Sequence, residues 1–103
     1  DIPEGSAIVS VSIVNNTTFR IICNGKVTFT TRTFANPDRF IVDLPGIYVL
    51  TDQTEFPINR SGVIRARVGY HPADRFSRVV FDLSRPMDLE ATAIDNYVQI
   101  RIR

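Results

Sequence analysis

Apolar and polar residues alternate in eight short segments that together cover most of this 103-residue chain. Successive side chains of a β-strand point to opposite faces of the sheet, so a period of two residues indicates strands with one buried face. On this pattern we expect strands at residues 8–14, 18–23, 26–34, 39–44, 63–70, 77–83, 89–94 and 97–103. Eight strands in a chain of this length predict an all-β sandwich or barrel.

The composition favours strands over helices and a single domain over several. Val, Ile and Thr together number 32, whereas the helix-favouring Ala, Leu, Met, Glu, Lys and Gln together number 17. β-Branched side chains fit a pleated, half-buried surface. Chains divide into several domains only well beyond this length, and no Pro-, Gly- or Ser-rich linker interrupts the sequence. We therefore expect one domain over residues 1–103.

Charge and apolar run length narrow the classes of partner. Twelve basic and eleven acidic side chains leave a net charge of +1, too small for a field that attracts nucleic acid or an anionic membrane. No apolar run reaches the roughly 18–20 residues of a membrane span, so we expect no membrane insertion. Eleven of the basic residues are Arg and one is Lys26. Because the planar guanidinium group binds carboxylates in a two-pronged way, this bias points to a partner that carries carboxylates.

The last two predicted strands form a hairpin whose register follows from the sequence. With a two-residue turn at Asp95 and Asn96, the small and apolar side chains share one face, and Glu90 lies opposite Arg101 on the other. The residues on the apolar face are Leu89, Ala91, Ala93, Val98, Ile100 and Ile102. A shift by one residue would reverse both faces, so we expect this register.

A second hairpin is expected at Asn24 and Gly25. A two-residue turn there would place the apolar side chains of 18–23 and 26–34 on opposite faces of the sheet. A three-residue turn over 23–25, with Gly25 in the left-handed conformation, places them on one face. We therefore expect a bulged hairpin.

Two of the predicted strands are near-copies of each other. Residues 39–44, RFIVDL, and residues 78–83, RVVFDL, share the order Arg, three apolar residues, Asp, Leu. The Arg and the Asp of each copy point to the same side of their strand, opposite the inward-facing residues. The repeat predicts a sandwich of two similar small sheets with an internal pseudo-twofold axis.

Four segments together carry a resemblance to a known family. They are NPDRFIVDLPG at 36–46, GVIRARVG at 62–69, SRVVFDL at 77–83 and YVQIRI at 97–102. In this order and spacing they resemble the AMIN domain, which is found on the N-terminal side of bacterial cell-wall amidases and of the type IV pilus secretin. The resemblance extends from Val9 to Arg103. It implies a periplasmic β-sandwich of two similar sheets that binds peptidoglycan and carries no catalysis.

The charged motif positions of the family fall in this sequence on Arg39, Asp43, Arg67, Arg78 and Asp82. The resemblance implies that these side chains lie on exposed faces and take part in binding peptidoglycan.

For the charged residues of the predicted strands, two interpretations remain open. As peptidoglycan ligands, Arg65, Arg67 and Arg78 would donate paired hydrogen bonds to stem-peptide carboxylates. As cross-strand ion pairs, one register places Arg65 opposite Asp82, and a shift by two residues places Arg67 there. Exposed pairs contribute only about 0.2–1 kcal/mol to stability, a weak reason for repeating the pattern in both halves. We therefore favour binding.

The segment YHPADRF at 70–76 departs from the family in being richer in aromatic and basic residues. Tyr70, His71 and Phe76 are candidates to stack on a sugar ring. For Tyr70 and Phe76 the alternative is to cap the end of the core, and for His71, which precedes Pro72, it is a solvated turn.

The sequence offers no credible catalytic or metal-binding set. His71 is the only histidine and Cys23 the only cysteine, and they fall on different predicted hairpins. Asp43 and Asp82 are conceivable as a glycosidase pair, but the pseudo-twofold axis predicts that they lie on opposite sheets rather than about 5–9 Å apart. Cys23 is expected to be a small buried hydrophobe. We expect no catalytic residue, no metal and no cofactor.

The function expected from the sequence is that of a non-catalytic domain of the Gram-negative periplasm. It would bind peptidoglycan and so localise an attached N-acetylmuramoyl-L-alanine amidase or pilus secretin at the cell wall. Other envelope proteins are further candidate partners. The alternative is a protein-interaction module that docks to a secretin ring or to the division machinery without binding glycan.

Overall fold

The computed structural model describes residues 6–103 as strands joined by turns. In chain order the strands are β1 (Ala7–Asn15), β2 (Thr18–Cys23), β3 (Thr30–Phe34), β4 (Arg39–Pro45), β5 (Tyr48–Val49), β6 (Glu55–Arg60), β7 (Val63–His71), β8 (Phe76–Leu83), β9 (Leu89–Ile94) and β10 (Tyr97–Ile102). None of the described residues is helical, and they contain no helix long and apolar enough to cross a membrane.

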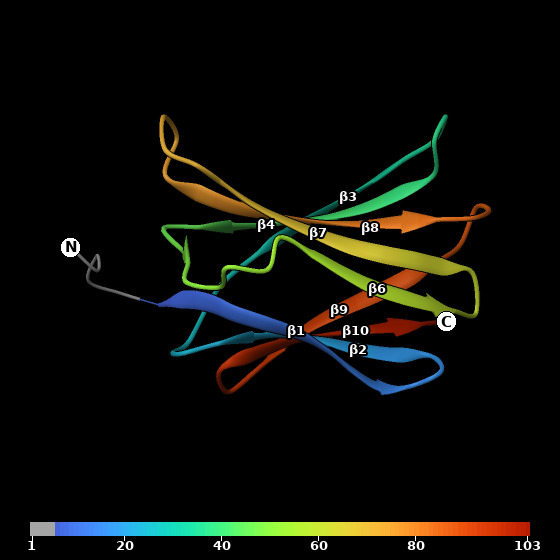
Figure 1. Ribbon diagram of the computed structural model, residues 1–103, viewed down its shortest axis with the longest axis horizontal. Coiled ribbons are helices and arrows are strands. Elements are labelled where there is room, and N and C mark those ends of the chain that lie inside the picture. Colours follow the sequence, from blue (N-terminus) through green and yellow to red (C-terminus); the bar gives the residue numbers. More distant parts are fainter. Residues whose placement is uncertain (1–5) are drawn as a thin grey trace.

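The strands form two sheets of five strands each that pack against each other (Figure 1). The first sheet has the order β5-β1-β2-β10-β9 and the second has the order β3-β4-β8-β7-β6. In Figure 1, β1, β2, β9 and β10 lie in the lower half of the view, and β3, β4, β7 and β8 lie in the upper half. The predicted all-β sandwich of two similar sheets is confirmed.

The inward faces of the two sheets meet in one apolar core. Phe19 of β2 and Phe81 of β8 are fully buried, and their rings stack with centroids 6.5 Å apart. Phe40, Val42 and Leu44, the inward residues of β4, are buried in the same core. Burial of one such side chain contributes about 1.5–3 kcal/mol, so the core holds the sheets together and leaves their outer faces free for charged residues.

The two sheets share an internal twofold arrangement. A twofold rotation exchanges β1 with β9 and β2 with β10 in the first sheet, and β3 with β7 and β4 with β8 in the second. It leaves both strand orders unchanged, apart from the edge strands β5 and β6. The near-copies in β4 and β8 are antiparallel neighbours, with Arg39 opposite Asp82 and Asp43 opposite Arg78. The predicted pseudo-twofold axis is confirmed. The expectation that Asp43 and Asp82 lie on opposite sheets is wrong, because the axis passes through both sheets and relates β4 to β8 within the second one.

The C-terminal hairpin has the predicted register. In the pairing of β9 with β10, Glu90 lies opposite Arg101 and Leu89 lies opposite Ile102. The two charged side chains approach each other to 3.6 Å between Arg101 Nη2 and Glu90 Oε1. The predicted register of this hairpin is confirmed.

The hairpin expected at Asn24 and Gly25 does not form. β2 pairs with β1 and β10, whereas β3 begins four residues later than expected and pairs with β4 in the other sheet. Asn24 ties the end of β2 to β1, since its Oδ1 accepts a hydrogen bond from the Ala7 amide at 2.7 Å and its own amide donates to the Ala7 carbonyl at 3.0 Å. The chain then crosses to the second sheet, with Val27 and Phe29 packed against the core.

Two edge strands were not expected from the alternation pattern. β5 is only two residues long and pairs in parallel with β1, and β6 pairs with β7. β6 contains Pro57, which cannot donate to a sheet ladder and is tolerated at a sheet edge. Its Phe56 and Ile58 are buried in the core, so the exposed Glu55 is carried beside the charged residues of β7.

Candidate functional site

The outer face of the second sheet, here called the arginine face, gathers the charged residues that the sequence singled out. Because inward and outward residues alternate along each strand, strands that bury apolar side chains in the core present charged ones on this face. Its charged members are Arg32, Arg39, Asp43, Glu55, Arg65, Arg67, Arg78 and Asp82. Of the residues that the structure describes, five arginines and three acidic residues lie on it, so these residues give the face an excess of positive charge.

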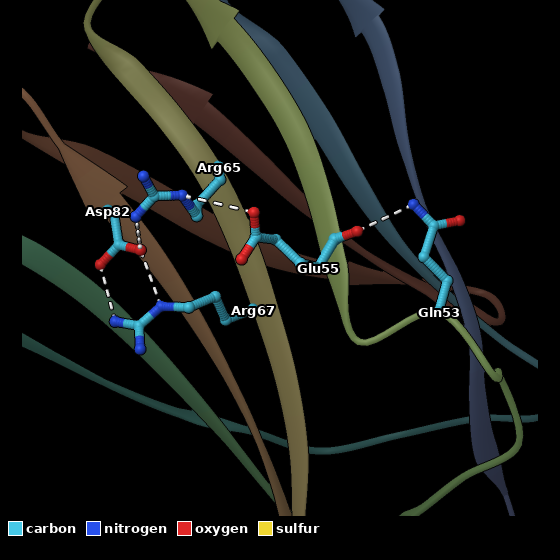
Figure 2. A network of polar contacts seen from close by, with 5 residues as sticks. All are labelled: Gln53, Glu55, Arg65, Arg67 and Asp82. Atoms are coloured by element: carbon cyan, nitrogen blue, oxygen red, sulfur yellow. Dashed lines mark hydrogen bonds and ion pairs between the residues drawn. The ribbon is translucent and has the colours of Figure 1, made fainter.

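Asp82 of β8 is held between two arginines of β7 (Figure 2). Arg67 donates from Nε and Nη2 to the two carboxylate oxygens at 2.7 and 2.8 Å, and Arg65 donates from Nη1 to Oδ2 at 3.0 Å. Arg65 lies opposite Asp82, and Arg67 is the next residue on the same face. Arg65 also lies 3.7 Å from Glu55, whose backbone carbonyl accepts a hydrogen bond from Gln53. Both arginines considered as partners of Asp82 therefore bind the same carboxylate.

Asp43 of β4 repeats this arrangement. Arg78 of β8 donates from Nε and Nη2 to the two carboxylate oxygens at 2.8 and 3.1 Å, and Arg32 of β3 donates from Nη2 to Oδ2 at 2.9 Å. Both aspartates are mostly buried, with 15% of the Asp43 side chain and 12% of the Asp82 side chain exposed. Each half of the arginine face thus contains one carboxylate shared by two guanidinium groups.

The arginines keep both carboxyl groups ionised. Burial by itself raises the pKa of the Asp43 carboxyl, but the hydrogen bonds and charges of its two arginines outweigh burial and hold that pKa below its ordinary value. The same balance lowers the pKa of Asp82. Hydrogen bonding to these carboxylates in turn raises the pKa of Arg67 and of Arg78. The two clusters therefore stay charged at neutral pH.

Arg39 is the exception to this pattern. Although it lies opposite Asp82 in the register, its guanidinium forms no ion pair within residues 6–103, and its buried Nε has no hydrogen-bond partner in that range. The guanidinium carbon instead lies over the ring of Phe34, 5.3 Å from the centroid.

The internal symmetry explains why Arg39 is displaced. The residue of β3 opposite Asp43 is Thr30, and the equivalent residue of β7, opposite Asp82, is Arg65. Because Thr30 carries no charge, Asp43 remains open to Arg78, the arginine of the other near-copy. At Asp82, Arg65 binds the carboxylate in the place that Arg39 would take by symmetry. Among residues 6–103, no carboxylate therefore pairs with Arg39.

A shallow depression lies on the arginine face at Gly69 of β7. Its volume is about 230 Å³, and it is lined by Arg67, Val68, Gly69, His71, Arg78 and Val80. Gly69 lies opposite Arg78, and a Cβ added at Gly69 would meet no atom within 4 Å. The missing side chain therefore leaves open space between the charged groups of two neighbouring strands.

The three aromatic candidates of the β7–β8 hairpin divide between the two sides of the sheet. His71 and Phe76 lie on the arginine face with nearly parallel rings, 4.5 Å between centroids, and the Arg78 guanidinium lies 5.2 Å from the Phe76 centroid. Tyr70 is on the opposite side, with its ring 5.0 Å from that of Tyr48 in β5. Of the three, His71 lines the depression.

The other candidates for chemistry do not come together. Asp43 and Asp82 are separated by four residues along paired strands, about 13 Å at the rise of a β-strand, which exceeds the roughly 5–9 Å of a glycosidase pair. Cys23 is 1% exposed, as expected for a buried hydrophobe, and burial raises the pKa of its thiol to about 11. Within residues 6–103 no three His, Cys, Asp or Glu side chains form a group that could hold a metal ion.

The outer face of the first sheet has a different character. There the Arg20 guanidinium lies over the Tyr97 ring at 4.4 Å. Glu90 lies 3.6 Å from Arg101 and 3.2 Å from Arg103, but it is 39% exposed, far more than the two aspartates of the arginine face. The two outer faces are therefore not chemically equivalent.

Arg32, Phe34 and Gly69 are among the residues of the arginine face that received no role in the sequence interpretation. A weak signal for them exists, because the register aligns TTRTF at 30–34 with RARVG at 65–69. Only the arginine is shared between these two segments, so their equivalence is visible only once both strands are paired with the near-copies.

The fold and this face define an all-β sandwich domain in which one sheet presents fixed arginines at its surface. The AMIN domain model matches residues 9–102, nearly the whole chain, and the chain therefore belongs to the AMIN domain family. AMIN domains are non-catalytic, cell-wall-targeting domains that occur in periplasmic envelope proteins. No curated protein matches the chain significantly. The family membership inferred from the four motifs is confirmed.

Proposed function

We propose that residues 1–103 form one domain that binds peptidoglycan through the arginine face. In this proposal the domain works in the Gram-negative periplasm, catalyses no reaction and localises an attached N-acetylmuramoyl-L-alanine amidase or type IV pilus secretin at the cell wall. Membership in a family of cell-wall-targeting domains supports the location. The geometry of the arginine clusters supports the choice of face.

The observation that carries the proposal is the way in which two aspartates fix arginine side chains. Arg67 and Arg78 use Nε and Nη2 to bind Asp82 and Asp43, and within residues 6–103 the Nη1 of neither arginine makes a hydrogen bond. A guanidinium group has five N–H donors, so each arginine keeps donors for a ligand. Because its orientation is already fixed, each loses less side-chain freedom on binding.

The remaining candidates extend this surface. Arg39 and Arg65 lie on either side of Asp82, on the two strands that flank β8, and His71 and Phe76 add flat ring surface at the other end of the face. Asp43 and Asp82 act as positioning residues. Tyr70 contributes indirectly, through its packing against Tyr48. Peptidoglycan offers carboxylates, amide carbonyls and hydroxyls, all of which accept hydrogen bonds from arginine.

The test is cosedimentation with purified sacculi for the parent chain and for Arg67→Lys and Arg78→Lys. Lysine keeps the positive charge beside the aspartate but loses the planar fork, so we expect affinity to fall about three- to tenfold. Arg101→Lys, on the outer face of the first sheet, is the matched control and should bind within about twofold of the parent. Raising the salt concentration should weaken binding of the parent, because it screens charge interactions.

Equal sedimentation of all four proteins would mean that these arginines are only cross-strand partners. Sedimentation only with sacculi that retain attached proteins would favour the alternative function, docking to a secretin ring or to the division machinery. A thermal melt of each variant shows whether a loss of binding reflects a loss of folding.

A further inference from the structure

The internal symmetry of the arginine face shows what fits into the depression at Gly69. Phe34 of β3 lies opposite Arg39, and Gly69 of β7 lies opposite Arg78, the equivalent arginine of the other near-copy. The two positions are therefore related by the pseudo-twofold axis. In the first half a flat ring occupies this position under the guanidinium group, with the Arg39 carbon 5.3 Å from the Phe34 centroid. In the second half the position has no side chain.

The space at Gly69 suits a ring-shaped ligand. Gly69 and Val80 supply apolar surface, and His71 stands at the border with its ring stacked on Phe76. A volume of about 230 Å³ is below the roughly 300–1,000 Å³ of pockets for drug-sized ligands, so the depression fits a single ring and its substituents.

The charged groups beside the depression select for an anionic ligand. Arg67 and Arg78 both line it, and each is held on one edge by an aspartate. Within residues 6–103 the Nη1 of both arginines is unoccupied. Since a carboxylate can accept hydrogen bonds from two such groups, a ring that carries a carboxylate on a short substituent satisfies both parts of the site.

We propose, on the basis of the peptidoglycan binding put forward above, that the depression at Gly69 holds one sugar ring bearing a carboxylate. The apolar face of the sugar lies on Gly69 and Val80, and its carboxylate accepts hydrogen bonds from Arg67 and Arg78. In peptidoglycan this chemistry belongs to a muramic acid residue whose stem peptide has been removed, because its carboxyl group is then free. The domain accordingly prefers peptide-free glycan to glycan with attached peptides.

The surface around the depression favours a glycan over a protein as occupant. Protein–protein interfaces have an apolar centre that is rich in aromatic residues, Met and Arg but poor in carboxylates, whereas the arginine face carries Asp43, Glu55 and Asp82. On the arginine face the exposed large apolar side chain is Phe34, whereas the others in residues 6–103, Val9, Ile13, Val14 and Leu50, lie on or beside the β1–β5 edge of the first sheet.

The decisive variant is Gly69→Phe, which places in the second half the ring that Phe34 provides in the first. The added Cβ meets open space and the backbone of Gly69 is not in the left-handed region, so folding should be preserved. Gly69→Ala leaves most of the depression open. Thr92→Phe adds the same ring at an exposed position of β9 in the first sheet and is the matched control.

Three soluble probes separate the parts of the proposed ligand: glycan chains freed of stem peptides by an amidase, disaccharide-peptides, and chitotetraose, which has no carboxylate. We expect the parent to bind the peptide-free chains about tenfold more tightly than either other probe. In a ¹⁵N–¹H spectrum of the parent, the Gly69 amide should shift during this titration. Gly69→Phe should lose at least about tenfold in affinity for the peptide-free chains, Gly69→Ala should lose less than Gly69→Phe, and Thr92→Phe should stay within about threefold of the parent.

The outcomes distinguish this proposal from the broader function. If the parent and Gly69→Phe sediment equally with sacculi and bind peptide-free chains equally, the depression is not the site, although peptidoglycan binding stands. Equal affinity for chitotetraose and peptide-free chains would overturn the role of the carboxylate. If the parent binds no cell-wall material, the proposed function and this inference both fail. If Gly69→Phe does not fold, the Gly69 amide of the parent decides, because a signal that does not move overturns the proposal.

Discussion

Replacing Asp82 by Asn tests whether the shared carboxylate stabilises the sandwich. Asp82 accepts three hydrogen bonds from Arg65 and Arg67, at 2.7–3.0 Å, and its side chain is 12% exposed. Asparagine keeps the shape but removes the charge that both arginines face. Removing one partner of a fully buried ion pair costs about 3–5 kcal/mol, and an exposed pair is worth about 0.2–1 kcal/mol.

The arginines at Asp82 are 39% and 49% exposed and can hydrate when the carboxylate is lost, so the cost lies between these limits. We expect Asp82→Asn to lower the free energy of unfolding by about 2 kcal/mol at pH 7. In a domain of this size that corresponds to a fall in Tm of about 8–16 °C. The matched control is Glu90→Gln, which removes a far more exposed carboxylate from the other outer face and should cost less than about 0.5 kcal/mol.

The difference between parent and Asp82→Asn should depend on pH in a defined direction. The pKa of Asp82 is lower in the folded state than in the unfolded state, so the unfolded chain binds more protons in acid. The stabilisation is therefore complete above the unfolded pKa of about 3.9 and is lost as the pH falls through the lower folded value. Urea unfolding at pH 7, 5, 4 and 3 measures this. Equal stability of Asp82→Asn and Glu90→Gln at pH 7, or a difference from the parent that grows in acid, would refute the reasoning.

Four further predictions concern other parts of the molecule. Because burial raises the pKa of the Cys23 thiol to about 11, a disulfide reagent at pH 8 should modify the folded chain at least about a hundredfold more slowly than the unfolded chain, and equal rates would contradict this. Arg65→Thr should let the Arg39 guanidinium move to Asp82, which a crystal structure of the variant would reveal; an unchanged Arg39 would show that symmetry does not explain its position. Phe81→Ala should cost about 3–5 kcal/mol in urea unfolding, since the ring is fully buried in the core, and a cost below about 1 kcal/mol would contradict the packing described. The purified domain should release no fragments from peptidoglycan, with or without added zinc, and any release that follows the domain through purification would refute this.

Local alternation in the sequence was enough to predict which side of each main strand faces the core. The inward set of β4, Phe40, Val42 and Leu44, and the register of Glu90 against Arg101 follow from backbone geometry and a short turn. Pairing between distant strands was not predictable in this way. The alternation of residues 26–30 correctly indicated that Val27 and Phe29 pack against the core. The same alternation fits both a hairpin within one sheet and a crossing between two sheets.

The sequence predicted most of the residues of the candidate site, but not which of them bind one another. The sequence pointed to either Arg65 or Arg67 as the partner of Asp82, and in the structure both arginines bind it. This outcome depends on the register of β7 against β8, which shifts between Val63 and Arg65. Gly69 illustrates the same limit, because a missing side chain becomes a feature only when its neighbours across two strands are known.

The position of β10 in the strand order has a consequence for how the chain folds. It is the last strand of the chain, yet it lies between β2 and β9 in the interior of the first sheet. Its pairs with β2 join residues nearly eighty positions apart, and such distant contacts make folding slow, on the scale of milliseconds to seconds. Until β10 pairs with β2, the buried side chains of Val98 and Ile100 are missing from the core and the first sheet cannot close.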